Sequence, residues 1–437
     1  MDNIALVTVD SLRADHVGTY GYDRETTPEL DALADDALVF ENAIAHACAT
    51  RPSFPSILTS THGLLYGGFD HLSDEQVPLS VPLSEAGYAT AGFHSNPYLS
   101  AEFSYDRGFD TFNDSETDPS LAASLRRWVV DNVDGRLYDF LSWLHTKTEV
   151  HAGVDVGSYY EDATSLTDRA IAWVEQAEEP WFLWIHYMDP HHPYVPPDEY
   201  QVFGDTLSQQ RGVKLRQRVL DDPDALSEDE WDDLIDLYDA EVRYTDSEVG
   251  RLLDAIGDAV WAVTADHGEE FYEHGNFGHK NRFYDEHVHV PLVLGGIDRS
   301  GRSEALVGLN DVPPTLLEAV GVDAPDGYRG TNALDGKRDR VVGGWAPDVG
   351  RDLDSVRLMS RTIDEKYIYD AGAESHELYD LAADPEEAVN LGGEGATEHR
   401  AATDSFLEDV RETSTDSDSV DIDDNLEEQL QNLGYKT

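Results

Sequence analysis

The sequence predicts an α/β fold with a mostly parallel central sheet, helices on both of its faces and a small antiparallel subdomain towards the C-terminal end. Two observations favour this fold class. Short apolar runs alternate with helical patterns through most of the 437 residues, which is typical of a parallel sheet covered on both faces. From about residue 336 the runs become short and alternating, which favours antiparallel strands.

The first apolar run, residues 3–9, is rich in β-branched side chains and predicts a fully buried strand. Further strands are expected at residues 38–45, 89–94, 181–188, 260–265 and 291–294. Helices are expected at residues 27–37, from Pro52 onward, at 160–178 and at 228–256. Thr27 is a candidate N-cap, because Pro28 after it suits the first helical position.

These patterns divide the chain into three parts. Residues 1–335 are expected to form the catalytic α/β domain, with a less regular stretch at 104–155 that is a candidate insertion. Residues 336–411 are expected to form a C-terminal subdomain, with strands at 356–359, 366–369 and 377–381. Residues 412–437 are expected to be an acidic tail with a short helix at 426–433.

The charge balance excludes several classes of partner. The chain has 89 Asp and Glu against 30 Lys and Arg, a formal net charge of −59. We therefore expect no nucleic-acid partner, because phosphate contacts need clustered cations, and an anionic membrane surface would repel the chain. Disorder is one explanation of such acidity, but 8 Trp, 21 Tyr and 14 Phe favour a folded protein adapted to high salt.

Cysteine usage and hydropathy set the expected compartment. Cys48 is the single cysteine, so no intramolecular disulfide can form. The first ten residues lack the features of a signal peptide, and no apolar run is long enough to span a membrane. We expect a cytoplasmic protein.

Carboxylates follow two of the expected strands directly. Asp10 comes after residues 3–9, and Asp266 and His267 come after residues 260–265. Ligands gather beyond the carboxyl ends of parallel strands, so these side chains could converge on one divalent cation. Carboxylate and imidazole ligands suit Ca, Mn, Mg or Zn to different degrees. The alternative for Asp10 alone is a structural turn cap.

Thr50 is the candidate nucleophile. It lies where a strand passes into a helix, and a helix N-terminus favours an anion. A metal that binds the threonine hydroxyl would lower its pKa, so Thr50 is also a candidate metal ligand. The alternative is that Thr50 merely caps the helix. Cys48 is a weaker candidate, because a lone cysteine among alanines is typical of a buried side chain.

Other polar residues could bind the substrate. His191 and His192 follow the strand at 181–188, and either could protonate a leaving group. His279 and Lys280 follow glycines and could donate to an oxyanion. Asn96 follows another strand. Solvated loop histidines, a surface lysine and an ordinary turn are the corresponding structural alternatives.

A second metal site is also open at this stage. Its candidate ligands are Asp189, His191, His192 and His279.

Seven motifs, in order, make the chain resemble the sulfatase family of the alkaline-phosphatase superfamily, in a haloarchaeal-type, sulfatase-like form. They are VTVDSLRADHVGTYGY, PSFPSILTS, MDPHHPY, YDAEVRYTDSEVGRLL, TADHGEEFYEHGNFGHK, NDVPPTLLEAVG and ELYDLAADPEEAVNL. The resemblance implies the alkaline-phosphatase-like fold and a divalent metal ion. It implies that Asp10, Asp266 and His267 are metal ligands, that Thr50 is the nucleophile, and that His191 and Lys280 contact the substrate anion or leaving group. It assigns His279 and Asn96 to substrate binding less firmly.

The chain departs from the family pattern in three places. Ser11 stands where many sulfatases have a second Asp. Thr50 begins the frame in which sulfatases convert Cys or Ser to formylglycine, and Phe54 replaces its Arg, so formylglycine is not expected. The pair Asp266–His267 is similar to that of the phosphatase and phosphodiesterase branches rather than to the Asp-Asn of many sulfatases.

We therefore expect a metal-dependent hydrolase that cleaves sulfate or phosphate esters through a covalent Thr50 intermediate. A formylglycine hydrate can expel sulfate by collapsing to an aldehyde, whereas a threonine ester needs attack by water, a route familiar for phosphoryl groups. Arg51 and Lys280 would offset the charge of the transferring group. The expected substrate is a small-molecule or glycan ester, and no oligomeric state is predicted.

Two alternative functions remain open at this stage. One is a phosphoryl or phospho-alcohol transferase that uses the same nucleophile. The other is a non-catalytic, metal-stabilised glycan-binding protein.

Overall fold

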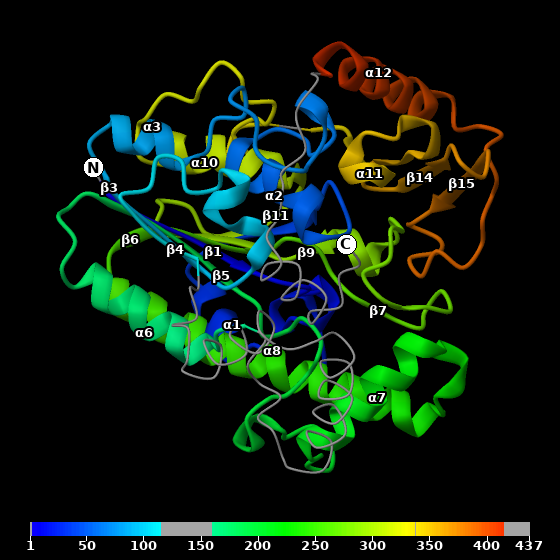
Figure 1. The fold of residues 1–437 in the computed structure, drawn as a ribbon, viewed down its shortest axis with the longest axis horizontal. Coiled ribbons are helices and arrows are strands. Elements are labelled where there is room, and N and C mark those ends of the chain that lie inside the picture. The colour runs from blue at the N-terminus through cyan, green and yellow to red at the C-terminus, as the bar shows by residue number, and fades with distance from the viewer. Residues whose placement is uncertain (1, 115–159, 337, 415–437) are drawn as a thin grey trace, which may run out of the picture.

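The computed structural model describes residues 2–114, 160–336 and 338–414. Its centre is a nine-stranded sheet in the order β11-β2-β10-β6-β1-β5-β3-β4, with β9 paired to β2 (Figure 1). The strands are β1 (Asn3–Val9), β2 (Leu38–Ile44), β3 (Ala89–His94), β4 (Thr111–Asp114), β5 (Trp181–Tyr187), β6 (Ala259–Ala265), β9 (His289–Val290), β10 (Leu292–Gly295) and β11 (Gly301–Gly308).

The sheet is mostly parallel, which confirms the predicted fold class. β1 pairs in parallel with β5 on one side and with β6 on the other, whereas β10 is antiparallel to both of its neighbours. The register places Val9 opposite Ala265 on β6 and Tyr187 on β5. Three carboxyl ends therefore meet at one edge of the sheet, and the residues that follow them share that edge.

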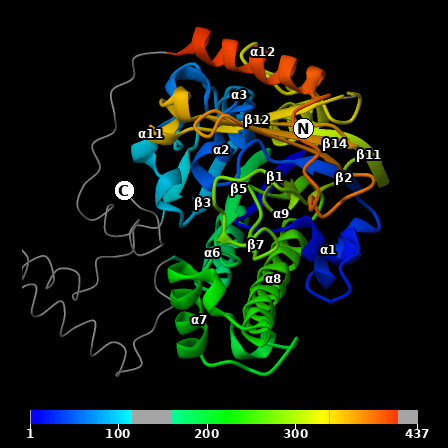
Figure 2. The same cartoon turned by 90° about the vertical axis from the view of Figure 1, so that its right-hand side faces the viewer.

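Helices cover both faces of the sheet (Figures 1 and 2). On one face lie α1 (Pro28–Ala34), α6 (Ala163–Val174) and α8 (Glu228–Ile256), with α7 (Gln209–Asp221) farther from the sheet. On the other lie α2 (Thr50–Thr59), α3 (Ser80–Glu85) and α10 (Val312–Ala319). Both faces of the central strands are thus buried, which explains their continuous apolar runs.

The start of α1 differs from the prediction. Thr27 precedes the helix, but its side chain makes no cap hydrogen bond. The amides of Glu29 and Leu30 instead donate to the carboxylate of Asp246 on α8, at 2.8 and 2.9 Å. The cap comes from a residue distant in the sequence, so local spacing could not identify it.

The C-terminal part forms a second, antiparallel sheet. Its strands are β12 (Val341–Trp345), β13 (Arg357–Arg361), β14 (Glu365–Asp370) and β15 (Ser375–Asp380), and α12 (Thr397–Thr413) packs beside it (Figure 1). The last three strands overlap the predicted ones, and β12 was not predicted. No helix among the described residues is both long and apolar enough to cross a membrane.

Two predicted regions fall largely outside the described residues. Of the candidate insertion at 104–155, only 104–114 is described, and β4 within it adds a parallel strand next to β3. The helix expected at 426–433 and most of the acidic tail lie outside the described ranges.

A buried lysine joins the C-terminal sheet to the α/β part of the chain. Lys366 on β14 is fully buried, and its Nζ lies 2.5 Å from Asp285 Oδ1 and 2.8 Å from Glu387 Oε2. Asp285 is the first residue of α9 (Asp285–Val288), and its other oxygen is 3.1 Å from the Arg361 guanidinium. A buried charge network of this kind is costly to break, because removal of one partner leaves the others uncompensated.

We expect Lys366→Met to lower the free energy of unfolding by about 3–5 kcal/mol, because the buried Glu387 loses its cation and Asp285 is left with Arg361. Denaturant unfolding in molar KCl would measure the change. Lys214→Met, at an exposed position on α7, is the matched control and should change stability by less than about 0.5 kcal/mol. Equal effects of the two substitutions would contradict the role given to Lys366.

Candidate active site

Four predicted residues converge beyond the carboxyl ends of β1 and β6. His267 Nε2 lies 3.7 Å from Asp10 Oδ1 and 3.6 Å from Asp266 Oδ2. Thr50 Oγ1 donates to Asp10 Oδ2 at 3.3 Å and lies 3.4 Å from His267 Nε2. All four side chains are buried. Residues up to 257 positions apart in the sequence therefore form one compact polar cluster.

Thr50 is the first residue of α2, not its cap. Ala49 occupies the N-cap position, and no side chain caps this helix. The Thr50 hydroxyl is directed towards Asp10 and His267, so the structural alternative for this residue is wrong. The amides of a first helical turn have no partner within their own helix, so a negatively charged group near the hydroxyl would be stabilised there.

The local backbone fixes the orientation of the His267 ring. Its Nδ1 lies 2.8 Å from the Gly268 carbonyl, which can only accept, so Nδ1 carries a proton and the lone pair of a neutral ring is on Nε2. Burial lowers the pKa of His267 to about 4, which keeps the ring neutral. Gly268 is required here, because a Cβ would lie 2.1 Å from the Glu286 carbonyl oxygen. The ring presents a lone pair to the two carboxylates.

The donor set fits a divalent cation. Asp266 Oδ2 is buried and has no hydrogen-bond partner within residues 2–114, 160–336 and 338–414. Burial, and then the charge of Asp10, raise the pKa of Asp266 to about 8. Burial also opposes the charged form of Asp10, but a hydrogen bond to His186 and nearby histidines hold the pKa of Asp10 well below its usual range. A cation among two carboxylates and an imidazole lone pair would offset this cost.

Two residues that organise the carboxylates were not predicted as site residues. Ser11 donates from its hydroxyl to Asp10 Oδ1 at 3.0 Å and from its amide to Asp266 Oδ1 at 3.3 Å. It adopts a left-handed φ of 57°, a conformation that a functional turn can impose. His186 on β5 places Nε2 3.4 Å from Asp10 Oδ2. A histidine within an apolar strand next to β1 was the available signal for His186.

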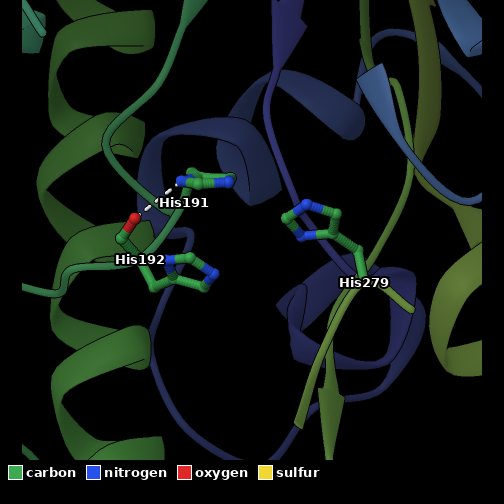
Figure 3. Close-up of side chains that lie close together, drawn as sticks. All are labelled: His191, His192 and His279. Atoms are coloured by element: carbon green, nitrogen blue, oxygen red, sulfur yellow. Dashed lines mark hydrogen bonds between the residues drawn. The ribbon is translucent and has the colours of Figure 1, made fainter. Parts of the chain in front are cut away.

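A group of three histidines lies beside this cluster (Figure 3). His191 and His192 come from the loop after β5, and His279 faces them from another segment, with ring centroids 5.0 and 5.8 Å away. The His279 ring is also 4.8 Å from that of His267. The three histidines predicted to contact the substrate therefore lie together next to the proposed nucleophile.

Hydrogen bonds favour different roles for these rings. The His192 carbonyl accepts from His191 Nδ1 at 2.7 Å, which leaves the lone pair of a neutral His191 on Nε2. Arg216 Nε donates to His192 Nδ1 at 3.1 Å, so a neutral His192 carries its proton on Nε2 and is a hydrogen-bond donor there. That arrangement disfavours His192 Nε2 as a ligand of a second metal.

His279 is set apart by a buried carboxylate. Its Nδ1 lies 3.4 Å from Glu269 Oε1, and Glu269 is fully buried. Burial lowers the pKa of His279, but the hydrogen bond and charge of Glu269 outweigh it and raise this pKa above its usual value. Glu269 thus favours the protonated form of His279 next to the cluster.

Four other predicted site residues have structural partners or remain apart. Asp189 accepts from the amide of Ala163 at 3.0 Å, at the start of α6, and burial raises the pKa of Asp189 to about 7. Arg51 donates to Asp70 Oδ1 at 2.9 Å and stacks on Tyr98, and Asn96 accepts from the Tyr98 amide at 3.0 Å. Lys280 is exposed. Their substrate roles stay predictions.

Comparison with known proteins identifies the family to which the chain is similar. The family model described as Sulfatase matches residues 2–322. The uncharacterised sulfatase YidJ of Escherichia coli (strain K12) is 22% identical over 421 residues, which cover 87% of this chain and 83% of that protein. Human iduronate 2-sulfatase is 28% identical over 335 residues, which cover 67% of this chain and 59% of that protein.

A solved structure with the same fold is the phosphonate monoester hydrolase of Agrobacterium radiobacter. It has a TM-score of 0.69 at 19% identity, over 94% of this chain and 95% of that one. The fold and the family match together define a hydrolase that acts on ester bonds. Within that class, the chain belongs to the sulfatase family, which confirms the family predicted from its motifs.

We expect Glu269→Gln to lower the pKa of His279, because the substitution removes the carboxylate that stabilises the protonated ring. Histidine-selective NMR titration of the metal-free chain would measure it. Asp254→Asn, which removes an exposed carboxylate, is the control for net charge and should leave this pKa unchanged. An unchanged His279 pKa in Glu269→Gln would contradict the pairing.

Proposed function

We propose that the chain hydrolyses sulfate or phosphate esters with Thr50 as its nucleophile. The observation that carries the proposal is the position of Thr50 Oγ1, within 3.4 Å of both Asp10 and His267 at the start of a helix. Asp10, Asp266 and His267, together with Thr50, would hold a divalent cation. Such an ion, when bound, would lower the pKa of the hydroxyl and offset the charge of the ester.

Thr50 Oγ1 attacks the sulfur or phosphorus atom, and the bond from that atom to the leaving oxygen breaks. Asp10 Oδ2 accepts the Thr50 hydrogen bond and orients the attacking oxygen, and the hydroxyl proton is released to solvent. In this proposal, the helix N-terminus and the Nε2–H of His192 would stabilise the oxygens of the transferring group. Arg51 and Lys280 add positive charge from farther out in this proposal.

We assign protonation of the leaving alcohol to His279 rather than to His191. Burial lowers the pKa of His191 to about 3, so this ring is neutral near pH 7 and is a poor general acid. Glu269 keeps His279 protonated, which suits a general acid. After the alcohol leaves, His279 is neutral and can accept a proton from the water that attacks the Thr50 ester. The bond between the transferred group and Thr50 Oγ1 then breaks, and the threonine oxygen regains a proton from solvent, so the His279 ring serves both steps.

Phosphate esters are the favoured substrates within this proposal. Thr50 stands in the position of the nucleophile, and a threonine ester is released by attack of water, as in phosphoryl transfer. Cys48 offers no alternative, because it is fully buried and burial raises the pKa of its thiol to about 12. Two similar proteins are named iduronate 2-sulfatase and phosphonate monoester hydrolase. The substrates to assay should therefore include sulfate, phosphate and phosphonate esters.

We expect removal of metal ions with a chelator to abolish activity. Adding back one of Ca²⁺, Mn²⁺, Mg²⁺ or Zn²⁺ should restore it. The assay uses aryl sulfates, phosphate mono- and diesters and phosphonate monoesters in molar KCl, because we propose that a chain of net charge −59 needs salt to stay folded. Adding alcohols tests for transfer to an acceptor other than water. Full turnover after chelation would contradict the metal dependence.

We expect Thr50→Ala to lower kcat by at least about 1,000-fold, because it removes the attacking oxygen. Thr50→Ser keeps a hydroxyl and should retain part of the activity. Mass spectrometry of an acid-quenched reaction should find the phosphoryl or sulfuryl group on the peptide that contains residue 50. Thr245→Val is the matched control, since Thr245 is buried on α8 and its hydroxyl has no partner. Full activity of Thr50→Ala would contradict the proposed role of Thr50 as the nucleophile.

A further inference from the structure

A second buried acidic group has no role in the proposed reaction. Glu270 belongs to β7 (Glu270–Phe271), and Glu286 and His287 belong to α9. One potential ligand atom from each residue lies within 4.8 Å of the others. Neither carboxylate forms an ion pair with a lysine or arginine in the described part of the chain, so their charges lack a cationic partner.

Several polar atoms of this group are buried without a hydrogen bond. Glu270 is fully buried; its Oε1 accepts from the amides of His274 and Asn276 at 3.1 and 2.8 Å, but its Oε2 has no partner among the described residues. Glu286 Oε1 likewise forms no hydrogen bond among the described residues, although His274 Nε2 lies 3.2 Å from it. Unsatisfied buried carboxylate oxygens are costly, and each calls for a ligand.

The histidine of the group completes a mixed set of donors. His287 is fully buried, and its Nε2 lies 3.9 Å from Glu270 Oε2 and 3.2 Å from the Gly278 carbonyl. The other ring nitrogen, Nδ1, has no partner among the described residues. Burial lowers the pKa of His287 well below its usual value, so the ring is neutral and does not neutralise the carboxylates. Because the Gly278 carbonyl can only accept, Nε2 carries the proton of the neutral ring, and Nδ1 has the lone pair that a metal ion would bind.

We propose that Glu270, Glu286 and His287 bind a divalent cation at a site distinct from the Asp10 centre. Two carboxylate oxygens and one imidazole nitrogen suit Mn²⁺ or Zn²⁺ better than Ca²⁺, which prefers oxygen ligands alone. His274 is the candidate fourth ligand, since its Nε2 lies 3.2 Å from Glu286 Oε1.

The position of this site gives it a structural role. It joins β7 to α9, and the Gly268 amide donates to the His287 carbonyl at 2.8 Å. β7 pairs with β8 (Phe277–Gly278), and His279 follows β8 directly. A cation bound by Glu270 and Glu286 would brace the hairpin between His267 and His279 without touching the substrate.

Metal counting on the full chain tests the proposal. The chain is stripped with a chelator, equilibrated with micromolar MnCl₂ in molar KCl, and its bound Mn²⁺ is measured by elemental mass spectrometry. We expect the wild type to bind one more ion than the double variant Glu270→Gln, Glu286→Gln. Glu75→Gln, at an exposed position, is the matched control and should bind as many ions as the wild type.

The design separates this inference from the proposed function. Asp10→Asn should lose the ion of the proposed active centre and keep the one at Glu270 and Glu286. If Asp10→Asn loses no ion while the double variant loses one, the inference stands and the metal centre of the proposed function fails. A double variant that keeps its circular dichroism spectrum and binds as much Mn²⁺ as the wild type overturns the inference.

A measurement on the wild type covers the case in which the double variant does not fold. Crystals of the unaltered chain equilibrated with Mn²⁺ should give an anomalous scattering peak between the Glu270 and Glu286 carboxylates. Density there without an anomalous peak, or no density, would overturn the proposal.

Discussion

The arrangement of the site depends on the repulsion between two buried carboxylates that the sheet forces together. Asp10 and Asp266 follow adjacent parallel strands in register, so their side chains must share the space beyond β1 and β6. Ser11 offsets part of the cost with two hydrogen bonds, and His186 Nε2 lies 3.4 Å from Asp10 Oδ2. The remaining negative charge of the two carboxylates would attract a cation. Asp10 also orients Thr50, whose hydroxyl donates to it.

The sequence was sufficient for features that local pattern determines. Buried strands read as continuous apolar runs, and the residues after them, such as Asp10 and Asp266, could be placed at one edge by topology alone. Features fixed by long-range contacts were out of reach. Nothing in the neighbourhood of Asp246 indicates that it caps α1, and nothing around Arg51 indicates its stacking on Tyr98. Helix α7 was missed because few of its residues are apolar, and the strand β12 was missed because two glycines interrupt its short apolar run.

Protonation states also come from tertiary partners rather than from residue type. His191 and His279 are both buried histidines of one cluster, yet Glu269 beside His279 raises its pKa while burial lowers that of His191. The motif alone favoured His191 as the acid, because it cannot reveal which imidazole a carboxylate faces. The proposed division of roles therefore depends on Glu269, a residue that touches neither the nucleophile nor its ligands in the described contacts.

The lysine at the centre of the C-terminal sheet has an implication for how this chain can be rearranged by recombination. Lys366 is bonded to Asp285, and the next two residues after Asp285 are Glu286 and His287. The C-terminal sheet is thus joined to α9, the helix whose His287 carbonyl accepts from the Gly268 amide. The sheet therefore cannot be exchanged independently of α9. A chimaera that imports this sheet from a distant relative would have to import a partner for Asp285 as well, or accept a displaced α9.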